Sequence, residues 1–362
     1  ETISENEDSL NLNVILAKMY YNENEYTNVI SLLAPLLDLP NKQENYWKLL
    51  ALSYQKIKEN SKAVSTYQKW LEESPNSTSA LIDNIFMLRT QNKIDKALVL
   101  SDKLISLQGE TPISHVIRIE LFLVNNDIAK ANQSYTQLSQ KLKVLPEIKG
   151  LLGQIQLLEK NYADAVTNLT AAYNKKPASN YGRLIYRCYE ALKQSSQAAN
   201  FLSSHLKHNA NDLWALMQLA LNQIPVDRNK AISTYQTVLE INQDVALAQN
   251  NLAFLLAEKG ELAQAAIHSK KAVSNEPKNP DYLDTLGKIL LDQNNAAEAV
   301  KYLTQAVEIS KDTIAEPIYL NYVEALIAND QMLLAKRKFD NFKFTKTDAK
   351  RIAQIKAKLP KE

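Results

Sequence analysis

Apolar residues recur along this chain at helical spacing. Separations of three and four residues place a set of apolar side chains on one face of a helix. Polar stretches divide one such set from the next. The pattern therefore predicts a succession of amphipathic helices with negligible strand. One clear example consists of Tyr46, Trp47, Leu50, Ala51, Tyr54 and Ile57.

One position repeats with a period of about 34 residues and is alanine in nine of ten cases. In most units a small residue lies twelve residues earlier, and a large apolar residue lies four residues later. Small residues on facing surfaces let two helix axes approach closely, and the large residue fills the space beside them. This predicts ten units of two antiparallel helices each. The repeating positions are Val29, Ala63, Ala97, Ala131, Ala165, Ala198, Ala231, Ala265, Ala299 and Ala335.

Proline positions agree with these units. A proline ends one helix or opens the next because it lacks an N–H and has a fixed φ. Pro35 is an exception, since it lies inside a predicted helix and should kink it. Eight of the eleven prolines fall at junctions between units: Pro40, Pro75, Pro112, Pro146, Pro177, Pro277, Pro280 and Pro317.

These residues resemble the signature of the tetratricopeptide repeat (TPR), a helix–turn–helix unit of about 34 residues. Trp47, Leu50, Ala51, Tyr54, Ala63, Tyr67 and Pro75 match it closely, as do Leu283, Leu286, Gly287, Leu290, Ala299, Leu303 and Ala306. The resemblance implies an all-α, right-handed α-solenoid. We expect a continuous array of about ten repeats over residues 1–345. A basic capping helix should follow over 346–362, starting near Thr347 as its N-cap and running to Leu359.

The repeat spacing becomes one residue shorter in the sixth and seventh units, as the positions of Ala165, Ala198 and Ala231 show. Pro225 also lies within the predicted turn of the seventh unit. We therefore expect the array to be irregular near residues 180–243, with a local change of twist and no domain boundary, because no flexible linker intervenes.

Charge and composition exclude several classes of protein. The 42 basic and 40 acidic residues give a net charge of +2, and nucleic-acid binders usually carry a clustered basic excess. The 35-residue helical repeat that reads RNA would also keep a constant period and a basic groove. No apolar run approaches the roughly 18 residues of a membrane span.

Catalytic and metal-binding chemistry find no support in the sequence. Among four histidines, only His205 and His208 share a helical face, and no nearby carboxylate or thiol cluster completes a metal site. We expect both to be partly exposed on an outer helix. Cys188 is the only cysteine, and we interpret it as a buried structural thiol. With six glycines and no phosphate-binding motif, the sequence predicts no catalytic residue, no metal and no cofactor.

The resemblance also implies a binding surface. In such repeats the first helix of each unit lines a concave groove through its second, fifth, ninth and twelfth positions. Aromatic, Met and Arg side chains gathered there are typical of a binding hot spot. In the alternative, Trp214 and Phe254 pack between units. The predicted partner-binding residues are Arg183, Arg187, Trp214, Met217, Asn250, Phe254, Asp284 and Lys288.

The C-terminal segment is basic. Residues 336–362 carry ten Lys or Arg against three acidic residues, a net +7 that leaves −5 for the rest of the chain. Such a segment could dock to an acidic partner or an anionic membrane. We favour a solvated cap, because the charges are spread around the helix.

The sequence predicts a non-catalytic scaffold that binds a peptide or helix of a partner protein, without nucleic acid. Residues 252–256 (LAFLL) and 281–287 (DYLDTLG) resemble bacterial TPR proteins associated with exopolysaccharide production and the PEP-CTERM/exosortase sorting system. That resemblance implies the bacterial cell envelope, with the cytoplasm as the alternative.

Because the sequence starts at Glu1 rather than Met, we interpret it as a fragment. The segment could then be the partner- or substrate-recruiting arm of an enzyme whose catalytic domain lies elsewhere. A carbohydrate-binding surface ranks last, because Trp47 and Trp70 fall in core positions and leave only Trp214 for a groove.

Overall fold

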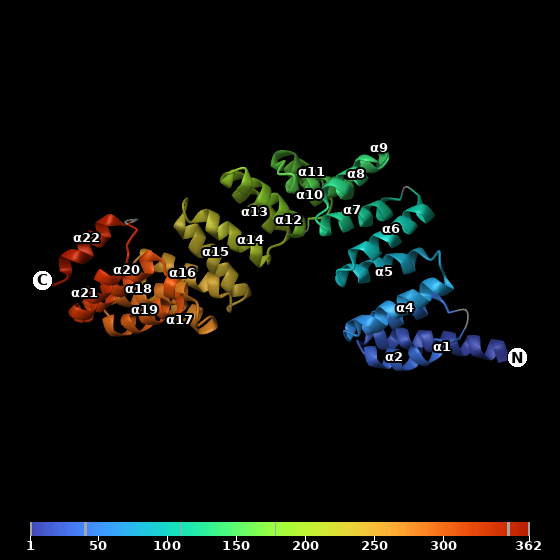
Figure 1. Ribbon diagram of the computed structural model, residues 1–362, viewed down its shortest axis with the longest axis horizontal. Helices are drawn as coiled ribbons and strands as arrows, with labels where there is room; N and C mark the ends of the chain where they lie inside the picture. Colours follow the sequence, from blue (N-terminus) through green and yellow to red (C-terminus); the bar gives the residue numbers. More distant parts are fainter. Residues whose placement is uncertain (1, 40–41, 110, 178, 346–347, 361–362) are drawn as a thin grey trace. The chain divides into compact units, whose positions relative to one another are not determined.

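The computed structural model describes residues 2–39, 42–109, 111–177, 179–345 and 348–360. These residues form helices and turns and contain no strand, which confirms the all-α prediction. The chain divides into two compact units, Glu1–Lys176 and Pro177–Glu362. Within each unit, consecutive helices pack as antiparallel pairs, as the predicted helix–turn–helix units require (Figure 1).

The first unit contains five pairs, with a short extra helix in the fourth. Its helices are α1 Thr2–Asn22, α2 Tyr26–Leu33, α3 Glu44–Lys56, α4 Asn60–Glu73, α5 Thr78–Thr90, α6 Ile94–Gln108, α7 Pro112–Val124, α8 Ile128–Thr136, α9 Gln140–Lys143, α10 Pro146–Leu158 and α11 Tyr162–Lys175.

The second unit contains five further pairs and one final helix. Its helices are α12 Ser179–Ala191, α13 Ser195–His208, α14 Leu213–Gln223, α15 Arg228–Ile241, α16 Ala246–Glu258, α17 Leu262–Asn275, α18 Pro280–Asp292, α19 Ala296–Ser310, α20 Glu316–Ala328, α21 Met332–Asn341 and α22 Ala349–Lys358.

The repeating column of small residues forms the centre of the core. All ten of its members, from Val29 to Ala335, have an exposed fraction of 0%. The glycine at Gly153 shows why such positions must be small. A Cβ added there would lie 2.7 Å from Cγ of Leu169 and 3.1 Å from the carbonyl oxygen of Ala165. Since one of these neighbours is backbone, α10 and α11 could accept the extra carbon only by moving apart.

The turn inside each pair is the same in nine of the ten pairs. Its middle residue has a positive φ, as at Lys58 (φ 65°), Asn294 (φ 60°) and Gly260 (φ 86°). The residue after it donates its N–H to a carbonyl five residues earlier, as Glu59 does to Tyr54 over 2.8 Å. This is the Schellman motif, which satisfies carbonyls at a helix end and fixes the exit direction of the chain.

The seventh pair departs from this rule. Its first helix α14 has 11 residues, whereas α12, α16 and α18 each have 13. The turn that follows contains Pro225, and none of its residues has a positive φ. Asp227 caps α15 by accepting a hydrogen bond from the Lys230 N–H at 3.1 Å. The seventh pair therefore differs from the other nine in its turn.

Three details differ from the sequence-based expectations. α2 ends at Leu33 and is not kinked; Pro35 lies in the 3₁₀ turn that follows it. The second helix of the fourth pair is broken into α8 and α9. The last helix is capped by Asp348, whose side chain accepts from the Arg351 N–H at 3.1 Å. Thr347, the expected cap, and Pro40, one of the junction prolines, lie outside the described residues.

The last helix covers the end of the second unit. Ile355 of α22 and Leu359, which follows the helix directly, are buried, with exposed fractions of 1% and 7%. They pack into the same hydrophobic cluster as Leu320 and Val323 of α20. The basic side chains around these two residues remain largely in solvent, which is the arrangement a terminal cap needs.

The close approach of α10 and α11 gives a stability prediction. Ala165→Leu should lower the free energy of unfolding by about 1–3 kcal/mol, because the larger side chain overpacks a fully buried contact. Lys175→Ala, at an exposed position on the same helix, should change it by no more than about 0.5 kcal/mol. Urea melts followed by circular dichroism measure both. Equal stability of the two variants would contradict this packing.

Candidate partner-binding groove

The predicted binding residues occupy equivalent positions of four first helices in the second unit: α12, α14, α16 and α18. Their exposure varies widely. Arg183 and Arg187 of α12 are exposed, Trp214 is half-buried, and Phe254 has an exposed fraction of 49%. The two arginines lie one turn apart and thus on one face of α12.

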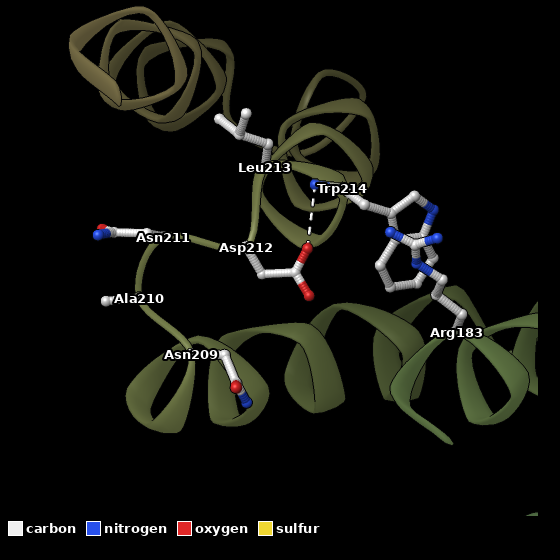
Figure 2. Close-up of a pocket in the computed structure, with 7 residues that line it drawn as sticks. All are labelled: Arg183, Asn209, Ala210, Asn211, Asp212, Leu213 and Trp214. Atoms are coloured by element: carbon white, nitrogen blue, oxygen red, sulfur yellow. Dashed lines mark hydrogen bonds between the residues drawn. The ribbon is translucent and has the colours of Figure 1, made fainter. Parts of the chain in front are cut away.

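Arg183 and Trp214 contact each other across α12 and α14. The guanidinium carbon of Arg183 lies 5.3 Å from the centre of the Trp214 ring, and Figure 2 shows the guanidinium over the indole. The ring of Tyr186 also contacts Trp214 in a T-shaped arrangement, with 5.5 Å between the two ring centres. A cation placed over an indole is attracted by the ring electrons, so the pair forms a fixed, partly apolar platform with a positive charge.

Met217 does not belong to the exposed surface that the sequence suggested. Its exposed fraction is 9% and it packs in a core cluster with Leu252 and Leu256 of α16. Its side chain is buried because it packs against the neighbouring helix α16. Leu221, one turn further on, is exposed at 41%.

The middle of the groove is apolar. Leu247 and Phe254 of α16 have exposed fractions of 46% and 49%. Asn250 lies between them on the same helix face, and its Oδ1 is buried without a hydrogen-bond partner. The helix α16 thus exposes two large apolar side chains on one face.

The C-terminal end of the groove is acidic and internally bonded. Asp284 of α18 accepts a hydrogen bond from Nδ2 of Asn321 on α20 at 2.7 Å. Arg351 of α22 donates to Oδ1 of the same Asn321 at 2.5 Å and to Oε2 of Glu324 at 2.6 Å. The helices α18, α20 and α22 are thus tied together by polar side chains.

The surroundings of Asp284 shift its titration. Burial raises the pKa of this carboxyl from 3.8 to about 6, and Asp281 adds to the rise. The hydrogen bond from Asn321 and the positive charges of Arg351 and Lys288 act in the opposite direction and are outweighed. Lys288 itself pairs with Asp292 on the same helix at 2.5 Å.

A cavity of about 560 Å³ opens beside the Arg183–Trp214 pair. It is lined by these two residues and by the segment 209–213, which joins α13 to α14 (Figure 2). The Asp212 side chain accepts hydrogen bonds from the N–H groups of Trp214 and Ala215 at 3.1 and 3.3 Å. Asp212 thereby caps α14 and sets the direction in which Trp214 leaves the loop.

His205 is part of this arrangement and was misjudged from the sequence. It is fully buried, not partly exposed, and its Nε2 lies 3.0 Å from Oδ2 of Asp212. The ring fits because Gly182 of α12 has no side chain; a Cβ there would lie 3.1 Å from Cε1 of His205. His208 remains exposed. An aspartate directly before an apolar helix, such as Asp212 before α14, is a sequence signal for an N-cap. No local sequence signal indicates that the same side chain contacts His205.

The remaining candidates for reactive or metal-binding groups are the thiol of Cys188 and clusters of His, Asp and Glu side chains. Cys188 is buried, and burial raises the pKa of its thiol to about 11, so the reactive thiolate is disfavoured at neutral pH. Within the described residues, no group of three or more His, Cys, Asp or Glu side chains could hold a metal ion. In the same part of the chain, no helix is long and apolar enough to cross a bilayer.

Comparisons with known proteins identify the repeat. Residues 280–313 match the family model for the tetratricopeptide repeat. No curated protein matches the chain. A tetratricopeptide repeat protein from Parabacteroides merdae superposes with a TM-score of 0.51 at 9% identity, covering 69% of this chain and 99% of that one. This likeness establishes the fold, an α-solenoid of such repeats.

Two further solved structures are partly similar. The MamA protein aligns with a TM-score of 0.42 at 19% identity, over 47% of this chain and 96% of its own. A chain of the APC/C hetero-tetramer Cut9–Hcn1 aligns with a TM-score of 0.41 at 13% identity, over 94% of this chain and 89% of that one.

The raised pKa of Asp284 predicts a pH dependence of stability. A carboxyl with a higher pKa in the folded state binds more protons there than in the unfolded chain, so stability falls as pH rises between its two pKa values. From pH about 4 to 7, the wild type should lose about 1–3 kcal/mol of unfolding free energy relative to Asp284→Asn. Urea melts at several pH values measure the difference, and a constant difference would contradict the burial of this group.

Proposed function

We propose that this chain, a tetratricopeptide-repeat solenoid, is a non-catalytic scaffold that binds a peptide or helix of a partner protein. The proposed site is the inner face of α12, α14, α16 and α18. It uses the predicted residues Arg183, Arg187, Trp214, Asn250, Phe254, Asp284 and Lys288, with Met217 beneath them as part of the core.

One observation carries this proposal. The side chains at equivalent positions change character along the unit, from the cationic Arg183 and Arg187 on α12 to the exposed apolar Leu221, Leu247 and Phe254 on α14 and α16, and to Asp281 with the half-buried Asp284 and Lys288 on α18. The exposed side chains among them are not needed for folding, because the core is made by the buried residues of each helix. Exposed Leu221, Leu247 and Phe254 leave apolar area in water, and a partner that covers them recovers the free energy of burial.

The same gradient describes the partner. Its segment should carry an acidic residue against Arg183 and Arg187, apolar residues in the middle, and a basic residue against Asp281 and Asp284. Complementary charges fix the register and direction of the segment, while apolar contacts supply most of the affinity. Asn250 adds a buried carbonyl that a backbone N–H of the bound segment can satisfy.

The pathway is a separate hypothesis. It rests on the resemblance of residues 252–256 and 281–287 to bacterial proteins of exopolysaccharide assembly and protein sorting. Cross-linking in the native cell, followed by mass spectrometry, should then recover an envelope protein of one of these systems. Recovery of cytoplasmic partners alone, or of a catalytic domain on the same polypeptide, would favour the alternative of a recruiting arm.

Single substitutions test the groove. With the captured partner, Arg187→Ala, Trp214→Ala and Phe254→Ala should each weaken binding by about 1–3 kcal/mol, because charged and aromatic anchors dominate such interfaces. Lys350→Ala on the exposed surface of α22 is the control and should matter little, and mainly at low salt. Circular dichroism confirms that each variant is folded. If the groove variants bind normally and the α22 variant does not, the basic cap is the site.

A charge exchange tests the direction of the partner. A peptide library selected on the wild type should be enriched in segments with acidic residues at one end and basic residues at the other. Selection on the double variant Arg183→Glu/Arg187→Glu should replace the acidic residues by basic ones and leave the apolar middle unchanged. Identical selections from the two proteins would show that α12 does not contact the ligand.

A further inference from the structure

We propose a second protein-binding site, on the first unit, which receives an aromatic side chain with a hydrogen-bond donor, tryptophan or tyrosine, from a partner protein. The site is a cavity of about 570 Å³ above α5, between α4 and α6. It is independent of the groove on the second unit. Its lining consists of Gln68, Leu71, Glu72, Asn84, Leu88, Lys96, Val99 and Leu100.

The cavity has apolar walls from three helices. Leu71 comes from α4, Leu88 from α5, and Val99 and Leu100 from α6. Binding pockets of this size are typically lined by apolar side chains with a few placed polar groups. Here Glu72 and Lys96 supply one charge of each sign on the two opposite walls. The space is therefore suited to an apolar body whose edges are polar.

Asn84 is the unusual residue in this lining. At this position of the repeat the residue is a fully buried leucine in three other units, at Leu50, Leu252 and Leu286, whereas it is Arg118 in the next unit. Asn84 has an exposed fraction of 4%, and its Oδ1 is buried without a hydrogen-bond partner. A buried amide oxygen without a partner costs free energy that leucine would avoid.

An aromatic donor is the occupant that matches both features. Aliphatic side chains and phenylalanine would fill the space but leave the amide unsatisfied. Tryptophan and tyrosine combine a large apolar ring with an N–H or O–H donor. The amide of Asn84 can turn about its Cβ–Cγ bond, since this torsion is broad, and can therefore present its oxygen to the occupant.

The surface around the cavity indicates that the occupant belongs to a protein rather than a free small molecule. Val99 at the rim has an exposed fraction of 68%, and Leu107, two turns further along α6, has 40%. A small ligand inside the cavity could not cover Leu107. A partner helix or loop that inserts one aromatic side chain could cover both.

Side-chain analogues test the chemistry on the full-length chain. p-Cresol, 3-methylindole and toluene stand for Tyr, Trp and Phe, and methyl NMR reports their binding at Leu71, Leu88, Val99 and Leu100. We expect p-cresol and 3-methylindole to shift these methyl signals with a Kd about 5–10 times lower than that of toluene, as one added hydrogen bond allows. Equal affinity of toluene, or no shift of these signals up to the solubility limit, would overturn the proposal.

Two variants refine the result. Asn84→Leu should abolish the preference for donors over toluene, because it removes the amide and fills the floor of the cavity. Asn200→Leu, at an exposed position of α13, should leave it unchanged. A preference that persists in Asn84→Leu would show that another group recognises the donor. The comparison of ligands on the wild type remains decisive if Asn84→Leu does not fold.

Discussion

The fold depends on a close contact at the centre of every helix pair, where one small side chain lets the two helices approach. Ten such positions, from Val29 to Ala335, are completely excluded from solvent. A larger side chain would push the helices of that pair apart. Each pair is also the surface on which the next one packs, so within a unit the error would pass to its neighbours. The period of the column, and not any single residue, therefore specifies the architecture.

Because the fold depends on so few positions in each pair, the other positions of each first helix are free to vary. The core uses the small column and the large apolar residues beside it, so positions such as Arg187, Leu247 and Phe254 contribute little to folding. Their composition can change from one helix to the next without disturbing the stack. The side chains at these positions can thus differ from one helix to the next, and the repeat fixes only the distance between the helices that carry them.

The fold could be predicted from the sequence because it is recorded in local, periodic signals. The buried alanines, the helix pairs and the prolines at helix starts, such as Pro112 and Pro280, were all predictable. The seventh pair was recognised as irregular, yet its register was not. Met217 is buried there because it packs against α16, and a spacing argument does not show which side chains a neighbouring helix will cover.

The contacts that shape the candidate sites were largely invisible in the sequence, since they join residues that follow no column. The burial of His205 depends on Gly182 in another helix and on Asp212 in the next loop. Asn84 could be read as an exception to a column, but whether its amide finds a partner depends on the packing of three helices. Local signals specify elements, whereas polar pairs between elements require the assembled structure.

Trp214, which contacts Arg183, lies on α14, the first helix of the irregular seventh helix pair. In a regular unit, apolar packing and the Schellman turn fix the first helix, and both are insensitive to small rotations of a side chain. At α14 that turn is missing from the C-terminal end of the helix, while the start of the helix is capped by hydrogen bonds to Asp212, which also contacts His205. Hydrogen bonds are directional, so this arrangement defines the position of the Trp214 ring, and with it the place of the Arg183 charge, more narrowly than the repeat could.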